Sequence, residues 1–97
     1  MIRHMAVFRW TPEATPEQRE RVCVELSRLP ALIPSLRAYH FGSDLGVNEG
    51  NFDFGVVADF DDVEAYLAYR ANAEHQDIIS RFSGPHAVSR AAVQYEI

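Results

Sequence analysis

Residues 51–82 decide the fold, and they read NFDFGVVADFDDVEAYLAYRANAEHQDIISRF. Apolar residues alternate over Phe52–Phe60, which predicts a strand that buries one face beneath a layer of helices. Aspartates then end the strand and open a helix that carries Tyr66 and Tyr69. This helix breaks near Asn72, which is predicted to be the N-cap of a second short helix that carries His75 close to its start. The order predicts that a tyrosine hydroxyl and an imidazole meet at one end of an apolar layer.

Length and composition indicate one globular domain over residues 1–97. Hydrophobic residues make up 47% of the chain and charged residues 24%, which is typical of a folded protein. The net charge is −5 and the basic residues are scattered, so neither nucleic acid nor an anionic membrane surface is an expected partner. No apolar run approaches the roughly 20 residues of a membrane span, and no signal-peptide core precedes the first strand. We therefore expect a cytoplasmic protein.

The sequence predicts neither a metal site nor a cofactor. The single cysteine, Cys23, has no internal partner for a disulfide, and no Cys and His residues have zinc-ligand spacing. The acidic cluster around Asp61 is better explained as a solvated helix start, which the helix dipole favours.

The remaining elements follow from the same periodicities. Thr15 opens a first helix with a capping box, and Pro16 takes its first helical position. Pro30 and Pro34 are predicted to end helical structure after it, and Ser83–Pro85 is predicted to end the last helix. The expected bounds are Pro16–Leu29 for the first helix and Ile2–Trp10, Leu36–Leu45 and Val88–Ile97 for three further strands.

Spacings of three and four residues predict which helical side chains are buried. They leave Glu25 on the outer side of the first helix. The predicted stripes are Val22, Cys23, Leu26 and Leu29 in the first helix, Val63, Tyr66, Leu67 and Arg70 in the second, and His75, Ile78, Ile79 and Phe82 in the third.

The element order β-α-β-β-α-α-β predicts a ferredoxin-like α+β domain, in which an antiparallel four-stranded sheet carries its helices on one face. The opposite face also carries apolar side chains, which would form an exposed interaction patch in a monomer. We therefore expect a homodimer in which two such faces meet around a barrel-like interior. The apolar residues of that face are Met5, Val7, Val57, Val93 and Tyr95.

Four segments resemble the stress-responsive A/B barrel (dimeric α/β-barrel, Dabb) family. They are HMAVFRW at 4–10, LPALIP at 29–34, the strand that begins with FDF at 52–54 and ends with DF at 59–60 and, most specifically, AYRANAEHQ at 68–76. The family's usual wording in the last segment is Tyr-x-x-His-Pro-x-His-Gln. This chain keeps Tyr69 and His75 but has Asn72 for the first histidine and Ala73 for the proline.

The resemblance implies a homodimeric α/β barrel. The family includes a plant branch of stress-linked stable oligomers and a plant polyketide cyclase, which closes a linear tetraketide by aldol condensation. In that cyclase the tyrosine and histidine that match Tyr69 and His75 carry the chemistry. A pocket histidine of its third strand is replaced here by Phe54.

The helix break gives this pair a physical basis as well. In one unbroken helix, residues six apart are separated by about 240° around the axis, so only a break lets Tyr69 and His75 converge. His75 falls at the third position of the last helix, where the dipole disfavours the imidazolium. A neutral imidazole can accept a proton, and Tyr69 can orient it or donate to a carbonyl oxygen as negative charge develops.

A cavity beside this pair is predicted to bind a small apolar or aromatic ligand. His4 either lines it or bonds a neighbour such as Glu96. His75 itself has a structural alternative, since a histidine on an apolar helical stripe often serves as a core or capping residue. The residues predicted to contact the ligand are His4, Phe8, Val22, Leu26, Tyr39, Phe54, Val56 and Ile79.

Three functions fit the sequence. The leading one is a small-molecule enzyme of the cyclase or lyase type, acting on a polyketide-like or aromatic substrate with Tyr69 and His75 as its acid–base pair. The second is a binding module with the same pocket and no turnover. The third is a stress-linked structural homodimer whose function lies in its interface.

Overall fold

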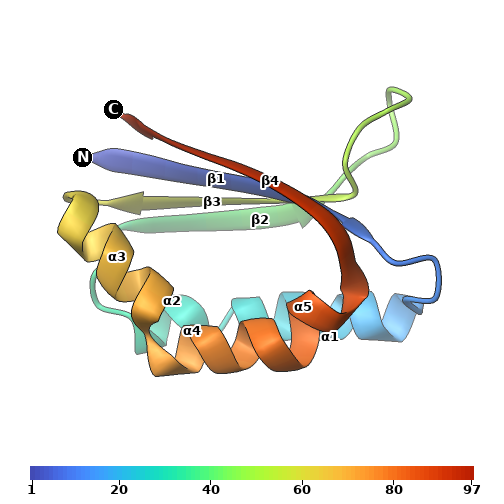
Figure 1. Cartoon of the computed structure of the whole chain (residues 1–97), viewed down its shortest axis with the longest axis horizontal. Coiled ribbons are helices and arrows are strands. Elements are labelled where there is room, and N and C mark those ends of the chain that lie inside the picture. Colours follow the sequence, from blue (N-terminus) through green and yellow to red (C-terminus); the bar gives the residue numbers. More distant parts are fainter.

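The computed structural model describes all 97 residues, as a four-stranded antiparallel sheet with helices on one face (Figure 1). The strands are β1 (Ile2–Trp10), β2 (Ala38–Ser43), β3 (Phe54–Phe60) and β4 (Ala87–Glu96), and they lie in the order β2-β3-β1-β4. The two ends of the chain lie side by side, at the same end of the neighbouring strands β1 and β4. The ferredoxin-like α+β architecture predicted from the element order is confirmed.

The side chains of the central strand β1 alternate between the two faces of the sheet, as the sequence pattern predicts. His4 and Phe8 are buried beneath the helices, whereas Met5 on the other face is exposed. β1 pairs in register with β3 and β4, so Ala58, His4 and Gln94 form one row across the helix-covered face. The sheet therefore places a residue of the edge strand β4 directly beside His4.

Helix α1 (Pro16–Leu26) begins at the predicted capping box. The Thr15 hydroxyl accepts the Gln18 N–H, and the Thr15 N–H donates to the Gln18 side chain. The helix ends earlier than predicted, and a short helix α2 (Leu29–Leu32) follows. The prediction that Pro30 ends helical structure is wrong, because a proline in the first turn of α2 gives up no intrahelical hydrogen bond.

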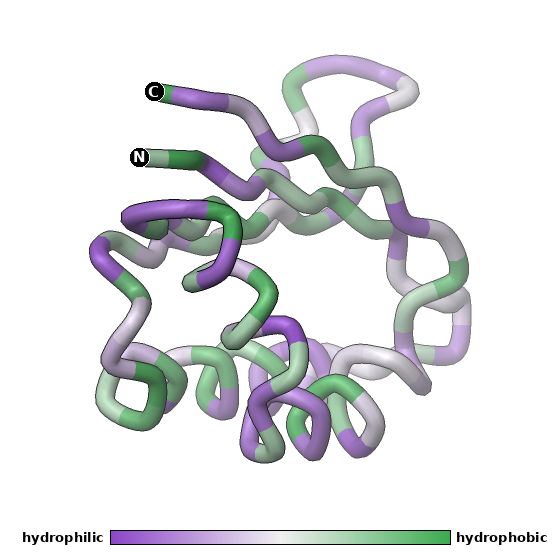
Figure 2. Tube along the Cα trace, turned by 60° about the vertical axis from the view of Figure 1, so that its left-hand side comes forward, coloured by the Kyte–Doolittle hydropathy of each residue, from purple (hydrophilic) through white to green (hydrophobic).

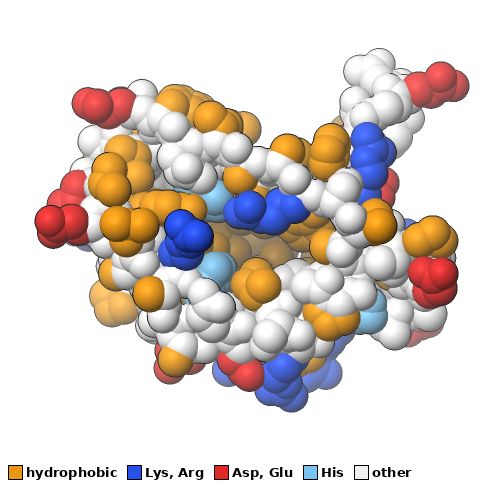
Figure 3. Space-filling model, in the orientation of Figure 1, with side chains coloured by type: hydrophobic (Ala, Val, Ile, Leu, Met, Phe, Trp, Pro, Cys, Tyr) orange, Lys and Arg blue, Asp and Glu red, His pale blue; other side chains and the backbone are white.

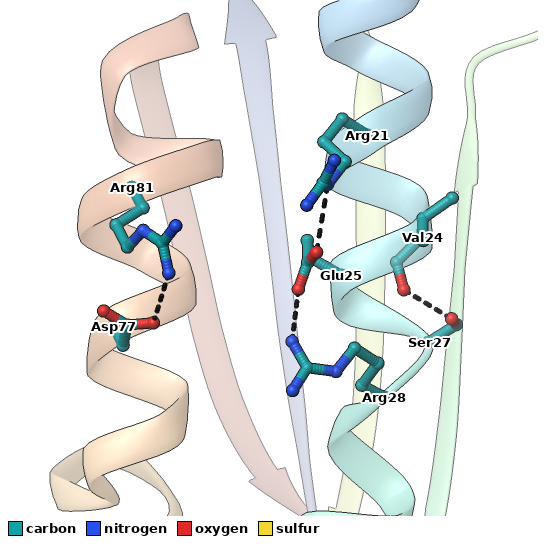
Figure 4. Close-up of polar contacts among 7 residues, drawn as sticks. All are labelled: Arg21, Val24, Glu25, Ser27, Arg28, Asp77 and Arg81. Carbon is teal, nitrogen blue, oxygen red and sulfur yellow. Dashed lines mark hydrogen bonds and ion pairs between the residues drawn. The ribbon is translucent and has the colours of Figure 1, made fainter.

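Glu25 on α1 is buried, with only 5% of its surface exposed, although its helical position predicted an outer residue. Its carboxylate accepts hydrogen bonds from Arg21 at 3.0 Å and from Arg28 at 2.5 Å (Figure 4). These charge-assisted bonds, first of all the one from Arg28, lower the pKa of Glu25. They also offset the desolvation of the carboxylate, so Glu25 can be buried. The sequence pattern placed Glu25 outside because spacing alone does not show these partners.

The strands β2 and β3 are shorter than their alternation predicted. Phe52 lies outside β3, in the loop 44–53 that projects beyond the sheet (Figures 1 and 2). The Arg9 guanidinium lies 4.3 Å from the centre of the Phe52 ring and donates to the carbonyl oxygens of Gly50 and Asn51. A cation–π contact therefore holds Phe52 in the loop, in place of the predicted packing on the inner face.

Helix α3 (Val63–Ala71) begins at the predicted aspartate cap, but its buried stripe differs from the prediction. Val63 and Leu67 are 58% and 48% exposed, whereas Tyr69 is buried. The helix rests on the end of β3, where the Tyr69 and Phe60 ring centres lie 5.1 Å apart. This contact turns the tyrosine face of α3 inward and leaves its aliphatic face outside.

The helical chain then runs without interruption through three segments, α4 (Ala73–Ile78), the π-helical turn η1 (Ile79–Ser83) and α5 (Gly84–His86). The prediction that Ser83–Pro85 ends the helix is wrong. The Gly84 N–H donates to the Ile79 carbonyl oxygen, and a Cβ atom at Gly84 would lie 2.7 Å from that oxygen. Glycine therefore permits the wide turn, since any side chain would press on the carbonyl.

The face of the sheet without helices stays open. Met5 and Val93 are opposite each other on β1 and β4, and Val93 is 53% exposed. Arg3 and Asp59 form a two-pronged ion pair on the same face, at 2.8 and 2.9 Å. The open face is thus a mixed surface with an apolar strip. None of the helices has the length and apolar character needed to cross a bilayer.

Candidate active site

A cavity of about 380 Å³ lies between the sheet and the helical layer. Strands β1 and β4 form most of its sheet side, and α3, α4 and η1 form most of its helical side. Figure 3 shows the hollow from outside, with histidine side chains in its wall and basic side chains beside it. Because residues 88–97 of the edge strand and chain end are exposed, the cavity opens to solvent beside β4.

The break between α3 and α4 brings Tyr69 and His75 to one wall of this cavity. Asn72 takes an extended backbone conformation with ψ of 133°, which ends α3. Its side-chain oxygen accepts the His75 N–H at 3.0 Å, so the predicted break and the predicted N-cap are both confirmed. The two ring centres lie 4.1 Å apart. An unbroken helix would have pointed these side chains in different directions.

The environment of His75 favours a neutral imidazole. Its Nδ1 is buried and has no hydrogen-bond partner in the protein. Burial lowers the pKa of His75, and the Arg90 charge lowers it as well, against an opposing effect of the Arg70 carbonyl. The sequence predicted the neutral form from the helix dipole, whereas the structure attributes it first to burial.

His4 lines the cavity opposite the tyrosines and is 4% exposed. Its ring centre lies 5.0 Å from that of Tyr66, and its Nδ1 accepts the Gln94 amide at 2.8 Å. Burial, with a contribution from Arg90, lowers the pKa of His4 to about 4. The two alternatives left open by the sequence hold together, because His4 lines the cavity and also bonds a neighbour, which is Gln94 and not Glu96.

Two tyrosine hydroxyls complete the polar wall. Burial raises the pKa of Tyr69 to about 12, with Tyr39 and Arg90 partly offsetting this effect. Burial also raises the pKa of Tyr39, whose hydroxyl has no hydrogen-bond partner. Both hydroxyls are therefore protonated at neutral pH and available as donors.

Every buried side-chain nitrogen or oxygen atom that lacks a hydrogen-bond partner belongs to the wall of this cavity. There are three of them, Tyr39 Oη, His75 Nδ1 and Ser83 Oγ. An unsatisfied buried polar group is costly and rare in folded proteins. Their concentration in one wall is the pattern expected of a site that presents polar atoms to a ligand.

Six of the eight residues predicted to contact a ligand line the cavity, and two do not. Val22 is fully buried, and Phe54 stacks among the rings of Phe8, Trp10 and Phe41. Both belong to the core because α1 packs directly on the sheet at that end. The six that line the cavity are His4, Phe8, Leu26, Tyr39, Val56 and Ile79.

The contribution of β4 to the cavity was not predicted from the sequence. Arg90 and Gln94 line the cavity from the same side of this strand. Their spacing of four residues puts both on one face of the strand. Only the pairing of β4 with β1 shows that this face is the one with His4, beneath the helices. Tyr66 was interpreted as packing, yet it also lines the cavity.

Comparison with solved structures supports the fold. A dimeric ferredoxin-like protein of unknown function from Thermobifida fusca is 45% identical, with 99% of this chain and 90% of that chain covered and a TM-score of 0.91. The Arabidopsis thaliana protein At3g17210 is 20% identical, with 100% and 95% covered and a TM-score of 0.87. A hydroxynitrile lyase from Passiflora edulis is 18% identical, with 99% and 92% covered and a TM-score of 0.87. At their low identities, the last two share the fold alone.

Family membership follows from the sequence. No protein of curated function matches it. The profile described as Stress responsive A/B Barrel Domain, however, matches residues 2–97, which includes every residue that lines the cavity. The chain therefore belongs to the stress-responsive A/B barrel (Dabb) family.

Proposed function

We propose that this protein is a small-molecule enzyme of the cyclase or lyase type that acts on a polyketide-like or aromatic substrate. The observation that carries the proposal is the pair of Tyr69 and His75 rings, 4.1 Å apart in the wall of a cavity of about 380 Å³. Apolar side chains such as Phe8 and Val56 line the same cavity and suit an apolar or aromatic substrate. The proposed chemistry needs no cofactor.

The proposed roles are those of a general base and a hydrogen-bond donor. Neutral His75 takes a proton from the carbon beside a substrate carbonyl, and the electron pair of that C–H bond moves to the carbonyl oxygen. Tyr69 donates a hydrogen bond to this oxygen as its negative charge develops. The enolate carbon then attacks a second carbonyl and closes a ring, and His75 returns the proton to the new alkoxide.

A lyase reaction would use the same pair. His75 takes the proton of a substrate hydroxyl, and a carbon–carbon bond breaks as the carbonyl forms. The leaving carbon group departs with the electron pair and receives the proton from His75. Tyr69 holds the substrate oxygen throughout.

Two likenesses favour these reactions. The segment from Tyr69 to His75 resembles the matching segment of plant olivetolic acid cyclase. The Passiflora edulis protein that shares the fold is a hydroxynitrile lyase. Because one fold hosts many chemistries, the reaction rests on the site itself and on its test.

Replacement of the base is the direct test. Wild-type protein, His75→Ala and Tyr69→Phe are incubated with a linear polyketide thioester and with mandelonitrile, and products are measured by mass spectrometry. Loss of the base is expected to lower kcat by about 10²–10⁴-fold while an aromatic ligand still binds. His86→Ala, outside the cavity, is the matched control. Unchanged product formation by His75→Ala excludes this residue as the base.

The second candidate function is a non-catalytic homodimer that binds a small molecule or has a stress-linked structural role. The exposed Met5 and Val93 of the open face favour an interface, and the related Thermobifida fusca protein is described as dimeric. We propose that two copies meet through this face. In such a protein, Val57→Asp would cost more stability than any change in the cavity.

Light scattering tests the interface. Val57 lies opposite Met5 in the register of β1 and β3, so Val57→Asp places a charge within the apolar strip. The wild type is expected to have the mass of a dimer at micromolar concentration, and Val57→Asp that of a monomer. A monomeric wild type contradicts the proposed interface.

A further inference from the structure

Two arginines differ from all the other basic residues of the chain. All nine basic residues are arginines, and seven have their guanidinium groups bound within the protein. Five pair with carboxylates. Arg9 and Arg19 donate to backbone carbonyl oxygens. No hydrogen bond or ion pair of the structure includes the guanidinium of Arg70 or Arg90, and both residues line the cavity.

The cavity has positive charge without a counter-charge. No aspartate or glutamate lines it, although the whole chain has 14 acidic and 9 basic residues. A free guanidinium in an acidic protein ordinarily finds a carboxylate, as the five paired arginines do here. Two unpaired guanidinium groups at one concave site are therefore a feature of that site, since the composition of the chain favours the opposite.

Arg90 also acts on the groups proposed to do the chemistry. Its charge lowers the pKa values of His4 and His75 and opposes the rise in the pKa of Tyr69. The sheet register explains this reach, because Arg90 lies opposite Phe8 on the helix-covered face, on the same side of β4 as Gln94. An anion held by Arg90 would therefore lie within electrostatic range of the Tyr69 and His75 pair.

We propose that the cavity recognises an organic carboxylate, whose charged group binds Arg90 and Arg70 while its aromatic or polyketide-like body lies against the apolar wall. This inference rests on the proposed function and names the substrate class of the same site. The guanidinium fork matches the two oxygens of a carboxylate, and such bonds are about twice as strong as neutral ones. The unpartnered Tyr39 hydroxyl and Ser83 hydroxyl are free to bind further oxygens of the substrate.

Binding of matched small molecules tests the proposal without any need for turnover. Dissociation constants of benzoate, phenylacetate, benzamide and phenyl phosphate are measured at pH 7.5 by calorimetry. We use wild-type protein, Arg90→Gln, Arg70→Gln and the control Arg81→Gln. Arg81 of η1 pairs with Asp77 of α4 (Figure 4), and it does not line the cavity. Benzoate and benzamide have the same size and differ in charge.

The wild type is expected to bind the carboxylates more tightly than benzamide. Arg90→Gln should weaken carboxylate binding by about 10- to 100-fold and leave benzamide within about twofold, because an ionic hydrogen bond is lost. Arg90→Lys should restore part of the loss, and Arg81→Gln should have no effect. Rising salt should weaken carboxylate binding in the wild type.

Several outcomes overturn the proposal. The proposal is wrong if the wild type binds the carboxylates and benzamide with equal affinity. It is also wrong if Arg90→Gln weakens the binding of the carboxylates and of benzamide by the same factor. Tighter binding of phenyl phosphate than of the carboxylates, lost in Arg90→Gln, overturns the carboxylate in favour of a phosphate. Failure of the proposed function is separate, because His75→Ala removes turnover in an enzyme but leaves carboxylate binding intact.

Discussion

The helical layer meets the inner face of the sheet in two different ways. Beneath α1 and α2 the contact is solid, with Val22 and Leu29 fully buried and Phe54 enclosed by aromatic rings. Beneath α3, α4 and η1 the same face borders the cavity, whose wall holds all three unpartnered buried polar atoms. The part beneath α1 and α2, the packed half, gains stability from close packing. The part beneath α3, α4 and η1, the hollow half, leaves a cavity beside the sheet and polar atoms without hydrogen bonds.

The charges follow the same division. In the packed half, the buried carboxylate of Glu25 is bound by Arg21 and Arg28. In the hollow half, Arg70 and Arg90 remain unpaired beside histidines that burial keeps neutral. The packed half thus satisfies its own polar groups, whereas the hollow half leaves several of its polar groups without a partner in the protein. Three substitutions or conditions test this contrast on the stability of the fold.

The largest effect is expected from Phe54→Ala in the packed half. The Phe54 ring centre lies 5.0 Å from that of Phe8 and 5.4 Å from that of Trp10, so its removal leaves a void among rings that cannot collapse. We expect a loss of about 3–5 kcal/mol in the free energy of unfolding, measured by urea denaturation. Ile79→Ala, on the wall of the cavity and 38% exposed, is the control and should cost about 1 kcal/mol. Equal losses would remove the distinction between the halves.

Much of the packed half could be predicted from sequence because its signals are local, although Pro30 and Glu25 were misread. The Thr15 capping box and the alternation of β1 depend on residues a few positions apart, and both are confirmed. The break at Asn72 is also local, since an asparagine cap sits in it. The same local signals were sufficient to place Tyr69 and His75 near each other.

The hollow half could not be predicted as completely, because it depends on distant contacts. Arg90 reaches the cavity only through the pairing of β4 with β1, which places it opposite Phe8, a residue from the other end of the chain. The face of α3 was misread because Val63 and Leu67 fit an apolar stripe, but the contact with Phe60 turns Tyr69 inward. Phe54 was wrongly predicted to line the cavity. Periodicity shows which face of the strand a side chain lies on, but it does not show where along that face a cavity is.

An intermediate effect on the free energy of unfolding is expected from acidification, which protonates His4 in the hollow half. The pKa of His4 is about 4 in the folded protein and about 6.5 when unfolded, so the unfolded chain binds more protons between these values. Stability is therefore complete above about pH 6.5 and falls as the pH drops toward about 4. The loss due to His4 is at most about 3 kcal/mol.

Urea denaturation at pH 7 and pH 4.5 measures this loss. His4→Gln, which keeps a polar group for Gln94, should lose less stability on acidification than the wild type. His86→Gln, outside the cavity, should lose as much as the wild type. An identical acid loss in His4→Gln and the wild type would mean that His4 is not held neutral by the cavity.

The smallest effect is expected from Ser83→Ala, which removes an unpartnered hydroxyl from the cavity wall. Since Ser83 Oγ forms no hydrogen bond within the protein, its loss should leave the free energy of unfolding unchanged or raise it by up to about 1 kcal/mol. Thr15→Ala removes a hydroxyl of similar size that does accept a bond, and it should cost about 1 kcal/mol. If Ser83→Ala is destabilised as much as Thr15→Ala, the hydroxyl serves the fold. If Ser83→Ala keeps its stability but binds aromatic carboxylates more weakly than the wild type, the hydroxyl serves ligand binding in the hollow half.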